Sequence, residues 1–374
     1  MTEINRKSWE PFHMLTRGEP SAGRHRVSRF HALTSELVES DAQVVPTACR
    51  FLGLDPDQAI SLDEVREFLR RYANATADDI GPEQAEQIRA ALATEIGAPR
   101  TYGEMLRTVE RSYQVVGKVW AALLTSFVAA ILREAQQYGV SDIVFLARDG
   151  ILFDVVYRSM PARYRAGMTN WILDLNRGMV GVDGSSDSAA VSDETLIRHV
   201  RASVPQRRGV AIVDTGLYGT LVHGMARLGL LGDSLVLFFS SRNPHVYGFL
   251  QTIMASAAEQ DFAILCCDTL ESWPKPYRQA RLVAGEAVAE AADPISLCAH
   301  LTLARSLAVG SGELDPDRVD PVVELAALDK TTAFGVPLLL PQAVEPWTGG
   351  PRLLDSEWDI GPLPPLPAPR RALV

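Results

Sequence analysis

The feature that most constrains the fold of this chain is a series of short, continuously apolar runs, each followed by a helical stretch. Strands that are apolar on both sides need cover on both faces, and helices provide that cover in a parallel sheet. The sequence therefore predicts an α/β fold with an open, doubly wound, mostly parallel sheet at about 139–290. By length and composition the strand candidates are 143–146, 170–175, 210–213 and 235–239, with a fifth at 262–266.

Helices are expected on both sides of this sheet in the sequence. Short helices are predicted over 27–98, where Ser61 and Glu64 form a capping box, and a longer one over 103–138, which Gly139 ends. The expected organisation is an N-terminal helical module at 1–100, an α/β core that carries the ligand site at 101–295, and helix and loop with a proline-rich tail at 296–374.

Charge and cysteine usage narrow the function classes. The formal net charge of -10 argues against sequence-independent binding of nucleic acid, which needs a basic surface. The 4 cysteines form no C-x-x-C pair, which favours reduced thiols in a cytoplasmic protein. The apolar segment 115–132 contains Lys118 and continues into charged residues, which favours a buried helix over a membrane span. We therefore expect a cytoplasmic protein that binds neither nucleic acid nor membrane.

One candidate site follows the strand at 210–213. Asp214 is followed by Thr215, Gly216, Gly219 and Thr220 at the predicted start of a helix. Such a segment offers backbone N–H groups at the positive end of a helix, hydroxyl groups, and a carboxylate for a cation or a sugar hydroxyl. The simpler alternative is a tight turn with an N-cap.

A second candidate site follows the strand at 143–146. Arg148 suits phosphate, Asp149 suits Mg²⁺ or acid–base chemistry, and Gly150 lets a ligand approach the backbone. The alternative is a surface turn. Because the carboxyl ends of parallel strands meet at one edge, where ligands bind in such sheets, we expect both segments to face a single anion-binding crevice. Arg177 and Lys275 are further phosphate-binding candidates.

Several segments resemble a known type of domain. In order, 119–124, 143–150, 210–220 and 269–271 are similar to a domain of bacterial polysaccharide-biosynthesis proteins, which are usually described as hydrolases of the haloacid dehalogenase (HAD) superfamily. The similarity extends over roughly 115–285. It implies a HAD-like phosphatase or phosphotransferase, with Asp149 as the nucleophile.

The order of elements also resembles a type I phosphoribosyltransferase. That resemblance implies Mg²⁺, with Asp214 orienting ribose hydroxyls or the cation and the amides from Gly216 to Thr220 holding the 5-phosphate. Arg148 and Arg177 would stabilise the leaving pyrophosphate. The second acidic residue of that family's ribose-binding pair is Thr215 here.

Three hypotheses follow. None of them identifies the acceptor substrate. The first is phosphoribosyltransferase-like glycosyl transfer on a phosphorylated sugar or nucleotide with Mg²⁺, and the second is the HAD-like reaction. The third is a non-catalytic nucleotide-binding or scaffold protein, whose N-terminal helices contact a protein partner or a second copy of the chain. The candidate catalytic residues are Asp149, Asp214 and Arg148; the phosphate-binding candidates are Gly150, Arg177, Thr215, Gly216, Gly219, Thr220 and Lys275; the candidate metal ligands are Asp149, Asp214 and Glu271.

Overall fold

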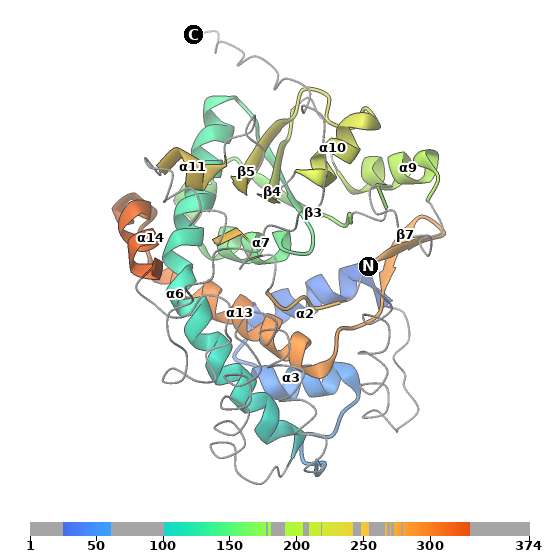
Figure 1. Cartoon of the computed structure of the whole chain (residues 1–374), viewed down its shortest axis with the longest axis vertical. Coiled ribbons are helices and arrows are strands. Elements are labelled where there is room, and N and C mark those ends of the chain that lie inside the picture. The colour runs from blue at the N-terminus through green and yellow to red at the C-terminus, as the bar shows by residue number, and fades with distance from the viewer. Residues whose placement is uncertain are drawn as a thin grey trace, which may run out of the picture.

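A four-stranded parallel sheet forms the centre of the fold (Figure 1). The computed structural model describes residues 25–60, 101–176, 179–180, 191–204, 209–217, 219–241, 248–253, 266–267, 270, 273–277 and 280–329. The strands are β2 (Asp142–Leu146), β3 (Thr169–Leu173), β4 (Ala211–Leu217) and β5 (Leu235–Ser241), in the order β3-β2-β4-β5. The predicted α/β class and parallel sheet are confirmed. Most of the fifth strand candidate, at 262–266, lies outside the described residues.

Helices cover both faces of the sheet, as the apolar strands require. On one face Ile143 and Phe145 of β2 join a core with α6 (Tyr102–Gln137), α7 (Gly150–Ser159) and α13 (Pro294–Glu313). On the other face Val144 and Leu146 join a second core with α9 (Asp193–Ser203) and α10 (Thr220–Arg227). All five residues of β2 are buried. This alternation explains why the residues from Ile143 to Leu146 are all apolar.

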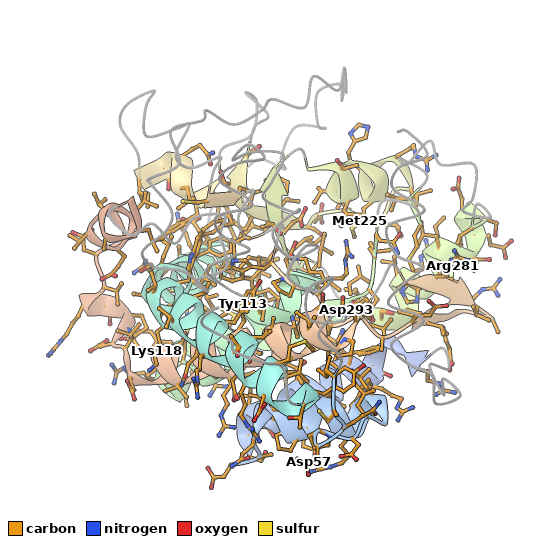
Figure 2. The ribbon with its side chains drawn as sticks, turned by 60° about the horizontal axis from the view of Figure 1, so that its bottom comes forward. Asp57, Tyr113, Lys118, Met225, Arg281 and Asp293 are labelled. Atoms are coloured by element: carbon orange, nitrogen blue, oxygen red, sulfur yellow. The ribbon has the colours of Figure 1, made fainter. Side chains whose placement is uncertain are left out.

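The long helix α6 agrees closely with the helix predicted over 103–138. It begins after Thr101, whose side chain accepts a hydrogen bond from the Glu104 amide, and it is followed by Gly139 at φ 67°. By length and composition alone α6 is long and apolar enough to cross a membrane, but 72% of its most apolar window is buried inside the fold. Lys118 lies on the outer side of this helix and is exposed (Figure 2).

Helices α6 and α13 run in the same direction and pack unusually closely. A Cβ atom added at Gly117 of α6 would lie 2.5 Å from Ser306 Cβ, and one added at Gly310 of α13 would lie 2.5 Å from Ala121 Cβ. One turn further, Thr125 Oγ1 donates a hydrogen bond of 2.9 Å to Ser311 Oγ. Small residues at successive turns therefore bring the two backbones together.

The N-terminal helices α2 (Val27–Glu39) and α3 (Val44–Leu52) lie where the sequence predicted short helices. The capping box at 61–64 and the helix expected after it lie outside the described residues. Side chains of α3 share one core with α6, α7 and α13, whereas Val27 and Phe30 of α2 join the second core. The helices therefore pack directly on the α/β core.

A small antiparallel sheet was not predicted. It joins β1 (His25–Arg26) to β7 (Glu286–Ala289), which pairs with β6 (Arg281–Val283). The β6–β7 hairpin turns at Ala284 and Gly285, with φ values of 51° and 85°. Positive φ at both positions suits a two-residue hairpin, but the Ala-Gly pair lacks the Asn or Asp that usually marks such a turn.

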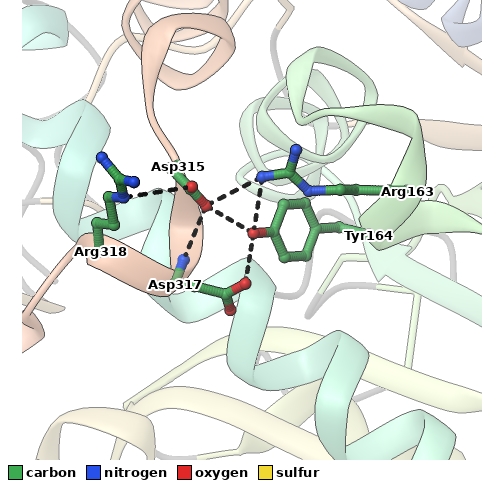
Figure 3. Close-up of polar contacts among 5 residues, drawn as sticks. All are labelled: Arg163, Tyr164, Asp315, Asp317 and Arg318. Carbon is green, nitrogen blue, oxygen red and sulfur yellow. Dashed lines mark hydrogen bonds and ion pairs between the residues drawn. The ribbon is translucent and has the colours of Figure 1, made fainter.

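The remaining elements are short. They are α8 (Ala162–Arg165), α11 (Phe249–Ile253), the 3₁₀ helix η2 (Pro316–Arg318) and α14 (Pro321–Asp329). The Tyr164 hydroxyl lies 2.6 Å from both Asp315 Oδ1 and Asp317 Oδ2, and Arg163 pairs with Asp315 at 3.2 Å (Figure 3). Hydrogen bonds to the two aspartates raise the pKa of Tyr164. This polar cluster joins α8 to the segment after α13.

The predicted end of β4 was wrong. The strand was expected to stop at 213 and turn through Asp214, Thr215 and Gly216, but it continues to Leu217. Gly216 and Leu217 still pair with β5, because β5 is also longer than predicted and supplies Ser240 and Ser241 as partners. The loop expected at 181–192 and the proline-rich tail lie wholly or largely outside the described residues.

Candidate functional site

The site lies where the direction of the sheet changes. From β2 the chain crosses to β3 on one side, and it then returns to β4 on the other side of β2. In doubly wound sheets, ligands bind outside the carboxyl ends of the two strands that diverge at such a point. Here these strands are β2 and β4, which pair directly through Phe145 and Val213. The two predicted segments follow or end these strands.

Asp149 is the centre of the polar contacts. It follows β2 and precedes α7, and its Oδ2 accepts a hydrogen bond of 3.0 Å from Thr215 Oγ1 on β4. Its Oδ1 forms an ion pair with Lys275 Nζ. The exposed fractions are 21% for the Asp149 side chain and 15% for that of Lys275. The hydrogen bond between Asp149 and Thr215 therefore joins the two segments, and the anion-binding crevice expected there stays a prediction. The ion pair with Lys275 was not foreseen.

Lys275 is held in position by contacts of its own side chain and of its neighbour Trp273. Its Nζ donates a hydrogen bond of 3.2 Å to Leu270 O, and Trp273 packs edge to face on Trp120 at 5.1 Å. Burial lowers the pKa of Lys275 well below its usual value, and the positive charge of Arg148 lowers it further. A fixed ammonium group that is partly shielded from water interacts strongly with an anion.

Gly150 has a structural role within the fold. A Cβ atom at this position would lie 2.9 Å from the backbone carbon of Phe145, so only glycine lets α7 begin this close to β2. This close approach places the first turn of α7 beside Asp149. The ligand contact expected of Gly150 stays a prediction.

The residues at the end of β4 divide between the two faces of the sheet. Successive side chains of a strand point in opposite directions, so Asp214, which is half-buried, faces away from Thr215 and Asp149. Gly219 adopts φ 66° and donates its N–H to Gly216 O at 2.8 Å, which closes the turn before Thr220 starts α10. The glycine turn follows Thr215 along the chain, and its expected role in phosphate binding remains a prediction.

The fit of Mg²⁺ can be tested on Asp149. Its Oδ1 already pairs with an ammonium group, which would repel a second cation at that oxygen. Among the residues that the structure describes, no group of three His, Cys, Asp or Glu side chains could hold a metal ion. Glu271, one of the predicted ligands, and Arg177, a predicted phosphate ligand, lie outside those residues. The described side chains around Asp149 therefore do not fit Mg²⁺.

Sequence reasoning missed three polar residues at the same edge of the sheet. Asp174 directly follows β3, and its Oδ1 lies 3.2 Å from the Tyr277 hydroxyl and 3.3 Å from His31 Nε2. Burial and the charge of Asp174 raise the pKa of Tyr277 well above its usual value, so the phenol stays protonated. Asp174 was missed because the strand was predicted to run to residue 175, which placed this carboxylate inside it rather than at its end.

The third of these residues is His31, which helix α2 supplies. Phe30 of this helix packs against the ring of Tyr277 with 5.1 Å between ring centroids, next to the contact of His31 with Asp174.

No family model, no curated protein and no solved structure matches this chain, so its chemistry is inferred from the site itself.

Proposed function

We propose that this protein is an enzyme that transfers the phosphoryl group of a phosphorylated small molecule, with Asp149 as the nucleophile. One observation carries the proposal. A carboxylate at the diverging strand ends is fixed by Thr215 through one oxygen and paired with Lys275 through the other. A nucleophile held in one orientation beside a positive group is the arrangement that covalent catalysis requires.

The reaction would proceed in two balanced steps. An Asp149 oxygen attacks phosphorus while the bond from phosphorus to the leaving oxygen breaks, and the leaving alcohol takes a proton from water. Water or another acceptor hydroxyl then attacks the acyl phosphate, which regenerates the carboxylate and releases a proton. Lys275 and Arg148 would stabilise the negative charge on the transferred group, since both lie at this edge of the sheet.

Trapping with beryllium fluoride tests the nucleophile. The fluoride complex should form a stable adduct with the wild-type carboxylate, detectable by fluorine NMR, and Asp149→Asn should abolish it. The matched control is Asp142→Asn, at the opposite end of β2, where the carboxylate accepts a hydrogen bond of 3.1 Å from Trp171 Nε1. This control should still form the adduct. An adduct that persists in Asp149→Asn would refute the proposed role.

A second candidate is phosphoribosyltransferase-like transfer, and the turn before α10 favours it. Gly219 closes a glycine turn at the N-terminus of that helix, where backbone N–H groups attract phosphate. In this reaction Asp214 rather than Asp149 would hold the ribose. Phosphoribosyl pyrophosphate with Mg²⁺ at 100 times its Kd would add about 2.7 kcal/mol of stability. Asp214→Asn should remove this stabilisation, and Asp149→Asn should not.

The third hypothesis, a scaffold without catalytic activity, gives a different pattern. Neither the beryllium fluoride adduct nor turnover of any phosphate ester would then be seen, and a nucleotide would at most raise the melting temperature. Beryllium fluoride trapping and thermal-shift measurements with phosphoribosyl pyrophosphate and with nucleotides together separate this outcome from the two enzymatic hypotheses.

A further inference from the structure

Asp174 lies beside the proposed phosphoryl site. The β2–β3 ladder continues past both strands, because the Ala147 amide donates a hydrogen bond of 3.0 Å to Leu173 O. Asp174 directly follows this contact, beside the segment that leads into Asp149. Neighbouring strands are about 4.8 Å apart, so the segments that carry the two carboxylates leave the sheet side by side at the same edge.

The segment 273–277 bridges the two carboxylates. Lys275 pairs with Asp149, and Tyr277, two residues later, contacts Asp174. The Cα atoms of Lys275 and Tyr277 are at most about 7 Å apart, so one short segment of the chain contacts both carboxylates.

Within the described part of the chain, one carboxylate oxygen of Asp174 is available as a hydrogen-bond acceptor. Its side-chain contacts with Tyr277 and His31 both involve Oδ1. Among the residues that the structure describes, Asp174 Oδ2 has neither a hydrogen-bond nor an ion-pair partner, and the exposed fraction of this side chain is 14%. A carboxylate with one oxygen fixed and the other open is suited to accept a hydrogen bond from a hydroxyl group.

We propose that Asp174, positioned by Tyr277 and His31, binds a sugar hydroxyl of the substrate whose phosphate lies at Asp149. The inference rests on the proposed phosphoryl transfer and names its substrate class, a phosphorylated sugar. The protonated Tyr277 phenol donates a hydrogen bond to Asp174 Oδ1 and so fixes that oxygen. A site built to hydrogen-bond a hydroxyl group discriminates strongly against an analogue that lacks it, because the buried acceptor is then left without a partner.

The test compares two probes that share the phosphate group. Ribose 5-phosphate carries hydroxyls and butyl phosphate carries none. We expect the wild-type ratio of kcat/KM for ribose 5-phosphate over butyl phosphate to fall by about 10- to 100-fold in Asp174→Asn, the loss of one hydrogen bond to a charged acceptor. Asp142→Asn, which removes a hydrogen-bonded carboxylate at the opposite end of the sheet, should leave the ratio unchanged.

A binding measurement separates the subsite from the chemistry. In the wild type, ribose 5-phosphate should raise the melting temperature more than inorganic phosphate does, and Asp174→Asn should make the two shifts equal. An unchanged ratio and an unchanged difference in shift would overturn the subsite while leaving the beryllium fluoride adduct intact. Loss of that adduct from the wild type would instead overturn the phosphoryl-transfer function, and the subsite with it.

Discussion

Replacing Gly310 with alanine tests the close contact between α6 and α13. The added Cβ would lie 2.5 Å from Ala121 Cβ, a separation that real Cβ atoms essentially never show. Both atoms are attached directly to helix backbones, so neither can rotate away and the helices must separate. Forcing a methyl group into such a contact costs about 3 kcal/mol, and the better helix propensity of alanine returns about 1 kcal/mol. We therefore expect Gly310→Ala to lower the free energy of unfolding by about 2 kcal/mol.

Gly312 is the matched control on the same helix. It is exposed, and a Cβ atom there would meet only Ser159 O at an ordinary 3.6 Å. Gly312→Ala should therefore raise the free energy of unfolding by about 0.5 kcal/mol through helix propensity alone. Urea unfolding followed by circular dichroism measures both variants. The reasoning would be refuted if Gly310→Ala were as stable as the wild type.

A swap of the two residues isolates the contact. Ala121→Gly alone should cost about 1.5 kcal/mol, from lost propensity and a small void. The double variant Ala121→Gly with Gly310→Ala moves one methyl group from α6 to α13 and should regain nearly wild-type stability. The coupling energy would then be about 3 kcal/mol. Additive effects of the two substitutions would show that the helices do not meet here.

Three more perturbations follow from the described contacts. Lys275→Met should lower the free energy of unfolding in urea by about 3 kcal/mol, because it leaves Asp149 without its counter-charge. Asp149→Asn should lower it less, since burial already lowers the pKa of Lys275 and the amine can lose its proton. Equal losses of stability in the two variants would contradict this asymmetry. Gly216→Ala should lower the free energy of unfolding by about 4 kcal/mol, because φ is 103° and the neighbouring strand fills the space that a methyl group needs. Gly229→Ala should lower it by about 1 kcal/mol, because φ is 67° there and the space is open. Thermal melts in which Gly229→Ala is the less stable variant would refute the packing argument. Burial lowers the pKa of His300 from 6.5 to about 3, so its neutral form contributes stability above pH 6.5 that is lost as the pH falls toward 3, at most about 5 kcal/mol. The urea midpoint of His300→Gln should fall less over that interval, and an equal fall would show that other groups cause the acid sensitivity.

Local patterns were sufficient for much of the fold. Continuous apolar runs located β2, β3 and β5, and the glycine after α6 marked the end of that helix within about one residue. The β6–β7 hairpin was missed because Ala284 adopts a left-handed conformation that the sequence does not signal. The end of β4 was missed because pairing with β5 overrides the turn preference of Gly216. Both errors come from contacts between strands rather than from local propensity.

The candidate site was predictable only in part, for the same reason. The rule that ligands bind at strand ends located Asp149 and Thr215, and the structure joins them by a hydrogen bond. The contact of His31 with Asp174 links helix α2 to a strand end more than a hundred residues away, which no spacing in the sequence indicates. The ion pair between Lys275 and Asp149 likewise depends on tertiary packing.

The pairing of α6 with α13 also affects how the chain is made. Thr125 and Ser311, which bond across these helices, are separated by 186 positions. At 5 to 20 residues per second, a ribosome needs about 10 to 40 s to synthesise the stretch between them. During that interval α13 does not yet cover its part of the apolar surface of α6, so a nascent chain of this protein should depend on chaperones until α13 leaves the exit tunnel.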